Sequence, residues 1–273
     1  MIAFQGVSVR YADAPRDAAH DVTFTTERGR MTALVGPNGS GKSTLVRALL
    51  GRQKLTAGRI TIDGAPLASL ARAQVARRIA VVTQREELSF PTPVSDYVAL
   101  GRFPHRGAWR SAGAEDRAAV ARAVELSGIG PLLERSVDTL SGGEWQRARI
   151  ARALAQGGEA MVLDEPTTYL DIAHEMEAFE LLSRLVREGM AVLLVSHQLN
   201  LVARFADMLV LLHDGRVAAS GIPDDVMRGA VLERVYGWPL VVTRDPAVGA
   251  PALVPLRGAP RRDSTLNPSS HIP

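Results

Sequence analysis

Apolar and polar residues alternate at the start of the chain, and further along the apolar residues gather into continuous runs. Within residues 2–9 the apolar positions are Ile2, Phe4, Val7 and Val9, a spacing typical of a strand with one buried face. A later strand over 60–62 ends at an Asp-Gly turn. The first 60 residues are therefore predicted to be rich in β-structure.

The continuous apolar runs predict a second kind of sheet. They occupy residues 31–35, 79–82, 160–163 and 191–195. A helix over 173–187 is predicted between the last two runs, and an Asp-Gly pair inside 209–219 predicts a hairpin. Runs without polar alternation are typical of parallel strands covered on both faces. The pattern therefore indicates an α/β fold around a mainly parallel sheet.

The middle and the end of the chain have a different texture. Helices are expected over 94–100 and 114–127, with an arginine-rich loop between them. We expect one domain over 1–242 that includes a helical subdomain at about 90–155. Residues 243–273 are rich in Pro, Gly and Arg, and we expect this tail to be partly disordered.

Residues 36–43 match the phosphate-binding pattern G-x-x-x-x-G-K-[ST] without substitution. An apolar run precedes them and a helical pattern follows, which is the context that this motif needs. The backbone N–H groups of such a loop bind phosphates at a helix N-terminus, Lys42 adds a cation, and Ser43 a hydroxyl for Mg²⁺. The predicted phosphate-binding residues are Gly36, Pro37, Asn38, Gly39, Ser40, Gly41, Lys42, Ser43 and Thr44.

Two further segments supply matching chemistry. The run 160–163 delivers Asp164 to a strand end, where it can hold Mg²⁺, and Glu165 beside it can act as general base. Leu140 is followed by Ser141, Gly142, Gly143 and Glu144. Ser141 is expected to cap the next helix, and the glycines to leave backbone N–H groups bare for a second anion.

Composition narrows the class of protein. The 273 residues carry a net charge of +3, 46% of them are hydrophobic, and none is cysteine. Disulfides and thiolate metal sites are thus excluded, and a cytoplasmic address fits. The N-terminus lacks the pattern of a signal peptide, and no apolar run approaches 18 residues. Arg102, Arg106 and Arg110 lack interleaved aromatic residues and are expected to form a solvated face, not a nucleic-acid site.

Seven ordered motifs over residues 1–240 make the chain resemble the nucleotide-binding subunits of ATP-binding cassette (ABC) transporters. In that family's terms they are Walker A at 36–43, Walker B at 162–165, the signature at 140–144, the Q-loop Gln84, the D-loop from Tyr169 to Asp171, the switch His197, and Tyr11 as the aromatic that stacks on adenine. Glu144 and Tyr169 depart from the commonest residues at their positions. The resemblance implies a P-loop cassette with a mainly parallel core, an N-terminal antiparallel β subdomain and a helical subdomain.

The resemblance also implies a mechanism. Two copies would join head to tail, each ATP lying between the Walker A loop of one and the signature of the other, where the N–H groups of Ser141, Gly142 and Gly143 would contact the γ-phosphate. Gln84 would ligate Mg²⁺ and orient the water, and His197 would bridge the γ-phosphate and Glu165. The residues alone leave other interpretations open: Tyr11 as strand packing, Gln84 as a solvated strand end, His197 as a helix-start residue, and Asp171 as an N-cap.

Three classes of ABC protein compete as interpretations of these motifs: the ATPase subunit of a membrane importer, a DNA-repair or chromosome-organising ATPase, and a soluble translation-associated protein. Chromosome-organising and DNA-repair ATPases need a long heptad insertion between Walker A and the signature, and none is present here. Translation-associated members carry two cassettes, whereas this chain has one Walker A. The resemblance therefore favours an ATPase on the cytoplasmic face of the membrane. It would dock onto a separate permease and serve a periplasmic or surface substrate-binding protein.

Three segments are similar to the subgroup that serves iron–siderophore, haem and cobalamin permeases. They are residues 98–105, 170–174 and 198–203. This similarity favours uptake of a ferric siderophore or haem, with vitamin B12 as the alternative. The region of residues 90–110 would receive the coupling helix of the permease.

Overall fold

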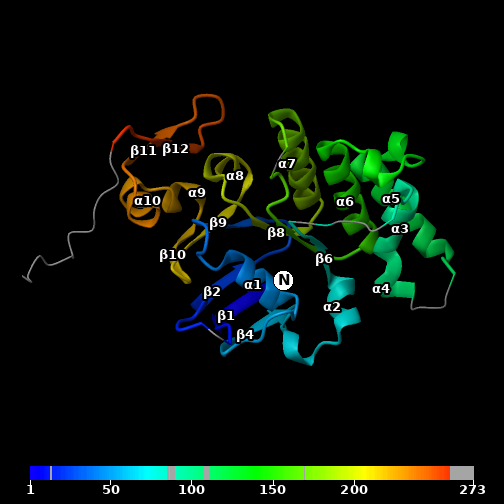
Figure 1. Cartoon of the computed structure of the whole chain (residues 1–273), viewed down its shortest axis with the longest axis horizontal. Helices are drawn as coiled ribbons and strands as arrows, with labels where there is room; N and C mark the ends of the chain where they lie inside the picture. The colour runs from blue at the N-terminus through cyan, green and yellow to red at the C-terminus, as the bar shows by residue number, and fades with distance from the viewer. Residues whose placement is uncertain (13, 85, 87–89, 107–110, 169, 259–273) are drawn as a thin grey trace, which may run out of the picture.

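The central sheet has six strands and runs through the middle of the molecule (Figure 1). The computed structural model describes residues 1–258 except 13, 85, 87–89, 107–110 and 169. The strands are β3 (Met31–Val35), β6 (Ile79–Val82), β7 (Ala160–Asp164), β8 (Ala191–Val195), β9 (Met208–His213) and β10 (Arg216–Gly221). Their order is β10-β9-β3-β8-β7-β6, and β10 alone pairs antiparallel. The predicted α/β class with a mainly parallel core is confirmed.

A second, antiparallel sheet packs against the first. Its strands are β1 (Ile2–Val9), β2 (Ala19–Thr26), β4 (Ala57–Ile62) and β5 (Ala65–Pro66), in the order β2-β1-β4-β5. Ile2 and Phe4 are fully buried, as their alternation with polar neighbours predicts. The pairing of β1 with both neighbours shifts register around Gly6, which has a φ of 59°. This bulge turns the later apolar residues of β1 inward as well.

Helices surround the central sheet. They are α1 (Lys42–Leu49), α2 (Arg72–Arg78), α3 (Val94–Ala99), α4 (Phe103–Arg106), α5 (Ala114–Ser127), α6 (Gly142–Gln156), α7 (Ile172–Arg187), α8 (Leu199–Phe205), α9 (Pro223–Val226) and α10 (Gly229–Tyr236). Short 3₁₀ turns cover Leu67–Ser69, Leu100–Arg102, Gly130–Leu132 and Val137–Thr139. In the part of the chain that the structure describes, no helix has the length and apolar character that crossing a bilayer requires.

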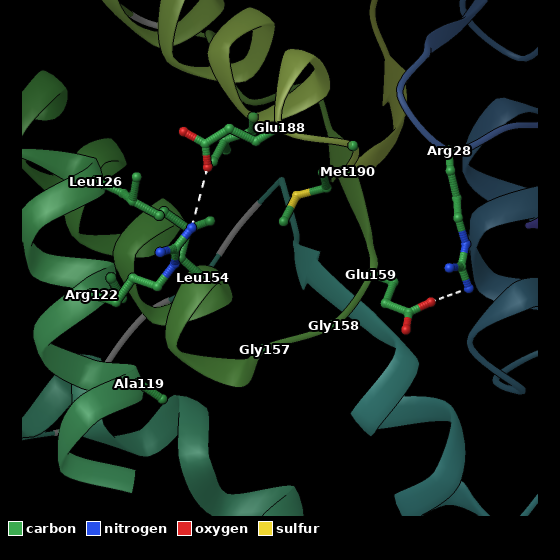
Figure 2. Close-up of a pocket in the computed structure, with 13 residues that line it drawn as sticks. Arg28, Ala119, Arg122, Leu126, Leu154, Gly157, Gly158, Glu159, Glu188 and Met190 are labelled. Atoms are coloured by element: carbon green, nitrogen blue, oxygen red, sulfur yellow. Dashed lines mark hydrogen bonds and ion pairs between the residues drawn. The ribbon is translucent and has the colours of Figure 1, made fainter. Parts of the chain in front are cut away.

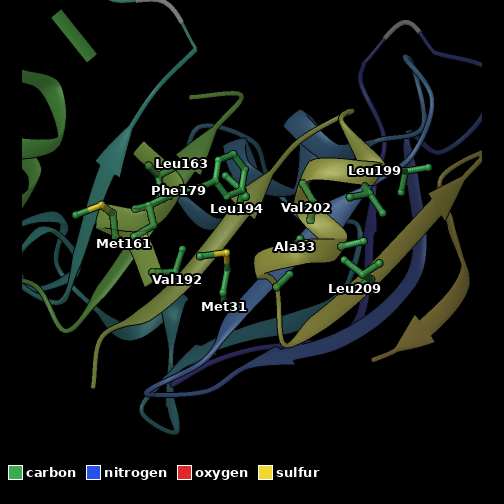
Figure 3. Close-up of a cluster of buried hydrophobic side chains, with 14 of the residues drawn as sticks. Met31, Ala33, Met161, Leu163, Phe179, Val192, Leu194, Leu199, Val202 and Leu209 are labelled. Carbon is green, nitrogen blue, oxygen red and sulfur yellow. The ribbon is translucent and has the colours of Figure 1, made fainter. Parts of the chain in front are cut away.

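Alternate residues of the central strands enter different cores. Met31 and Ala33 of β3 join the cluster shown in Figure 3, which also contains Phe179 of α7 and Val202 of α8. Leu34, the residue after Ala33, belongs to a second cluster with the antiparallel sheet and α1. The sheet is thus covered on both faces, which explains why its strands are apolar without alternation.

Helices α3, α5 and α6 share a third core and form a group at one end of the sheet. Arg102, expected to lie on a solvated face, is only 8% exposed. Its Nε donates to Asp116 Oδ1 at 2.9 Å, and its Nη1 donates to the carbonyl of Ala155 at 2.9 Å. That expectation was wrong for Arg102. An arginine can be buried where a carboxylate and the carbonyl groups of a helix C-terminus accept its hydrogen bonds.

The last two described strands form a hairpin that the sequence did not predict. Strands β11 (Leu240–Arg244) and β12 (Pro251–Pro255) pair antiparallel, and Asn200 of α8 exchanges two hydrogen bonds with the backbone of Leu253. The expected tail boundary at 242/243 therefore falls inside β11. The proline at each end of β12 argues against a strand in the sequence, because proline lacks the N–H that a strand needs. In a two-stranded sheet, however, both strands are edge strands, where proline is tolerated.

Candidate nucleotide site

The loop between β3 and α1 has a backbone that requires glycine. Gly36 has a φ of 144° and Gly41 a φ of 103°, both outside the range that L side chains adopt. A Cβ on Gly36 would lie 2.2 Å from the carbonyl oxygen of Leu212, and one on Gly41 would lie 2.4 Å from that of Ala18. The predicted loop thus packs tightly between β9 and the residue before β2, which fixes its backbone where α1 begins.

Lys42, the first residue of α1, directly follows this loop and is 6% exposed. Its Nζ donates to the carbonyl oxygens of Gly36 at 2.7 Å and Pro37 at 2.9 Å. Burial lowers the pKa of Lys42, although Glu165 and Asp164 oppose that shift. Neutral carbonyl groups balance the positive charge of a buried ammonium group only in part. The Lys42 ammonium can therefore still bind an anion that enters the loop.

Asp164 ends β7 next to the loop, and Glu165 follows it. Burial, and then the charge of Glu165, raises the pKa of Asp164. Its Oδ1 is buried and accepts no hydrogen bond among the residues that the structure describes. The backbone N–H of Glu165 donates to the carbonyl oxygen of Val195 at 2.9 Å, and Glu165 has a φ of 50°. Because of this left-handed backbone conformation, the chain turns away from the direction of β7 at Glu165, and the Glu165 carboxylate turns with it.

The three residues predicted to be catalytic meet at the Glu165 carboxylate. Gln84 Nε2 donates to Glu165 Oε2 at 2.9 Å, and His197 Nδ1 lies 3.5 Å from Glu165 Oε1. Thr168, which the sequence did not single out, donates from Oγ1 to Glu165 Oε2 at 3.4 Å. Its position three residues after Glu165 was the only feature of the sequence that could have identified Thr168 as a partner of this carboxylate. Each oxygen of the carboxylate thus has its own partner.

Tyr11 lies beside the first turn of α1. Its hydroxyl is 3.2 Å from Thr44 Oγ1, and Nη1 of Arg47 donates to it at 3.3 Å. The structure therefore brings Tyr11 to the predicted loop residues, together with an arginine that no sequence pattern identified. Ser43 lies in the same first turn.

The signature segment forms the start of α6. Ser141 caps the helix as predicted: Glu144 N donates to Ser141 Oγ at 3.3 Å, and Ser141 N donates to Glu144 Oε2 at 2.8 Å. That backbone N–H lowers the pKa of Glu144, with help from Arg135 at 3.0 Å. The N–H of Ser141 was expected to be bare, and this was wrong, because glutamate at the third helical position completes a capping box. Gly142 and Gly143 occupy the first turn, whose N–H groups have no partner within the helix.

Asp171 caps α7, which was one of the two interpretations left open. Its Oδ1 accepts from the backbone N–H of His174 at 2.9 Å and lies 2.7 Å from the ring Nδ1 of that residue. These interactions lower the pKa of Asp171. Tyr169, the other residue named in this segment, lies outside the described residues.

Helices α1 and α6, which begin at the loop and at the signature, cover opposite faces of the central sheet. Helix α1 packs through Leu45 into the core shared with the antiparallel sheet, whereas α6 packs through Ile150 into the other core. A separate cavity of about 400 Å³ lies near the beginnings of β7 and β8, between Glu159 and Met190 (Figure 2). Ligands of open α/β sheets bind at the carboxyl ends of strands, so this cavity lies at the wrong edge for the nucleotide.

Comparisons with known proteins agree with this geometry. The ABC transporter family profile matches residues 19–168. The chain is 42% identical over 251 residues to the ferric enterobactin transport ATP-binding protein FepC of Escherichia coli (strain K12), covering 91% of this chain and 92% of that protein. It is 40% identical over 242 residues to the hemin import ATP-binding protein HmuV of Nocardia farcinica, covering 89% and 83%. Among solved structures, an inward-facing metal-chelate type ABC transporter superposes with a TM-score of 0.81 at 26% identity, covering 93% of this chain and 97% of that one.

Proposed function

The chain belongs to the ABC transporter family, and from that premise we propose that it is the ATP-hydrolysing subunit of an importer for ferric siderophores or haem. Import of cobalamin is the alternative. The observation that carries the ATPase assignment is the meeting of Gln84, His197 and Glu165 beside the phosphate-binding loop. The cargo is proposed from the similarity to siderophore and hemin import subunits.

In this proposal Glu165 is the general base. Its carboxylate is oriented before substrate arrives, because Gln84 and Thr168 donate to one oxygen and His197 lies beside the other. A water placed between Glu165 and the γ-phosphate would lose its proton to this carboxylate as its oxygen attacks phosphorus and the bond to ADP breaks. Lys42 and the loop N–H groups would stabilise the charge on the phosphate oxygens, and His197 would face the γ-phosphate from the end of β8. Tyr11 would stack on the adenine.

The residues around Asp164 fit Mg²⁺. Magnesium takes oxygen ligands, and Asp164 presents a buried carboxylate oxygen that accepts no hydrogen bond among the described residues. Ser43, Gln84 and Asp164 would hold the ion, which when bound supplies positive charge against the phosphate oxygens. The raised pKa of Asp164 is consistent with this role, because a buried carboxylate without a cation is destabilised in its charged form.

A second copy of the chain would complete each ATP site, head to tail. The separate packing of α1 and α6 into different cores supports this arrangement, because the loop and the signature of one chain then belong to different parts of the molecule. Ser141, Gly142, Gly143 and Glu144 would contact the partner's nucleotide. In this arrangement Asp171 would lie near the interface, while its carboxylate caps α7.

A groove of about 1050 Å³ supports docking of a membrane permease at the helical subdomain. Phe103, 68% exposed, and Leu100 contribute apolar surface to it. Thr83 and Glu86, which flank Gln84, line the same groove. A coupling helix seated there would be next to the segment that contacts Glu165. The chain would thus act at the cytoplasmic face of the membrane, with a substrate-binding protein on the other side of the permease.

Growth and uptake assays test the cargo. A strain lacking this gene is expected to lose growth on a ferric siderophore or on haem as sole iron source. The wild-type gene is expected to restore growth, and the Glu165→Gln gene is not. Unchanged growth on every ferric chelate and on haem, with loss of cobalamin uptake, would contradict the iron assignment and favour the alternative.

A further inference from the structure

His174, in the first turn of α7, contacts two parts of the site and has no role in the mechanism above. Its backbone N–H donates to Asp171 Oδ1 at 2.9 Å, and its ring Nδ1 lies 2.7 Å from the same oxygen. The carboxylate that caps α7 therefore also fixes the direction of the imidazole ring.

The ring of His174 lies directly against Gly143 of the signature. A Cβ on Gly143 would lie 2.1 Å from His174 Cδ2 and 2.4 Å from Cγ, well inside van der Waals contact. Gly143 is not among the glycines with a positive φ. A side chain at this position would therefore have to displace the His174 ring, although the backbone angle itself would accept one.

We infer that His174 is a positioning residue that holds the signature loop in its binding conformation. Two successive glycines have large backbone freedom, and ordering them on a phosphate costs conformational entropy. The capping box of Glu144 fixes this turn by a hydrogen bond, and the His174 ring, held by Asp171, packs against Gly143. A loop ordered in advance binds its ligand more tightly.

This inference rests on the proposed ATP-sandwich dimer, and the experiment separates the two. The reference is the full chain with Glu165→Gln, titrated with MgATP while sedimentation velocity follows dimer formation. Adding His174→Ala is expected to weaken ATP-dependent dimerisation about tenfold, a typical coupling for residues in contact. Fluorescent-ATP binding by the monomer is expected to stay unchanged, because the signature acts on the partner's nucleotide.

His20→Ala is the matched control. The ring Nδ1 of His20 also lies 2.8 Å from an aspartate three residues earlier, Asp17, but neither residue belongs to the signature. This variant is expected to dimerise like the reference. Should His174→Ala unfold, His174→Asn keeps a donor for Asp171 and removes the ring.

Two outcomes are decisive. A His174 variant that dimerises like the reference contradicts the positioning role alone, whereas a reference chain that stays monomeric in MgATP contradicts the proposed dimer and this inference with it.

A double-mutant cycle gives a second measurement, one that a general loss of fold stability would not change. Gly143→Ala is expected to cost less dimer affinity in the His174→Ala chain, where the methyl group has room, than in the chain that keeps the ring. Additive losses would overturn the contact's role.

Discussion

Glu165 stands where β7 leaves the sheet, with a φ of 50° that few residues other than glycine adopt. A strained backbone at this point keeps the carboxylate between Gln84 and His197. The orientation of the base therefore depends on local backbone geometry as well as on its hydrogen bonds. A substitution that keeps the shape of the side chain will leave this geometry in place.

Glu165→Gln is expected to lower ATP turnover by about 10²–10⁴-fold, the usual contribution of a general base, while ATP binding remains. The amide fills the same space but cannot take the proton. Steady-state phosphate release and fluorescent-nucleotide titration measure the two effects separately. A variant that kept most of its turnover would exclude Glu165 as the base.

Asp164→Asn is expected to raise thermal stability while it abolishes activity. Burial raises the pKa of Asp164 above its usual range, so its charged form destabilises the fold at neutral pH. The neutral amide should raise the unfolding midpoint by about 2–4 °C at pH 7.5. As the pH falls through the raised pKa, the wild-type carboxyl gains its proton and the difference should shrink, vanishing below the unfolded-state pKa of about 3.9. Calorimetry over a pH series from about 7.5 to about 4 checks this, with the exposed Asp214→Asn as control.

At the scale of secondary-structure elements, the hairpin of β11 and β12 packs beside the candidate nucleotide site. Asn200 of α8 exchanges hydrogen bonds with Leu253 of β12, and His197, three residues before Asn200, lines a cavity of about 530 Å³ with Trp238 and Leu240. The hairpin thus forms a wall beside the residue proposed to face the γ-phosphate. Its removal would change both stability and the surroundings of His197.

Two truncations test the hairpin. Removal of 259–273 is expected to leave the unfolding midpoint and the ATPase rate unchanged. Removal of 240–273 exposes the apolar surface under Leu240 and leaves the amide of Asn200 without its partners, at a cost of at least about 2 kcal/mol. Chemical denaturation of both chains measures this. Equal stability of the two truncated chains would show that the hairpin is dispensable.

At the scale of the whole molecule, the proposed dimer requires each chain to carry two half sites, the loop before α1 and the signature before α6. Ser141→Arg is expected to leave ATP binding by the monomer intact and to abolish turnover at the site to which this signature contributes, since the long side chain would take the place of the signature beside the phosphate. Fluorescent-nucleotide titration and the dependence of ATPase rate on protein concentration measure this. Weak ATP binding by the monomeric variant would contradict the cross-interface site.

The sequence predicted the features that rest on neighbouring residues. The glycine loop, the strand that ends at Asp164, and the cap at Ser141 are short patterns whose geometry follows locally, and the α/β class follows from the apolar runs. Contacts between distant segments were missed: Arg47 on Tyr11, Arg102 on Asp116, Asn200 on Leu253 and His174 on Gly143. No local pattern encodes such pairs, because they depend on how the elements pack.

The separation of the loop from the signature also has a genetic consequence. A Lys42→Ala chain and a Ser141→Arg chain would each be inactive as homodimers, because both of their sites carry the defect. In the mixed dimer one site combines both defects, while the other pairs the sound loop of one chain with the sound signature of the other. Two null alleles of this gene should therefore complement each other in one cell, and either allele expressed with wild type should act as a partial dominant.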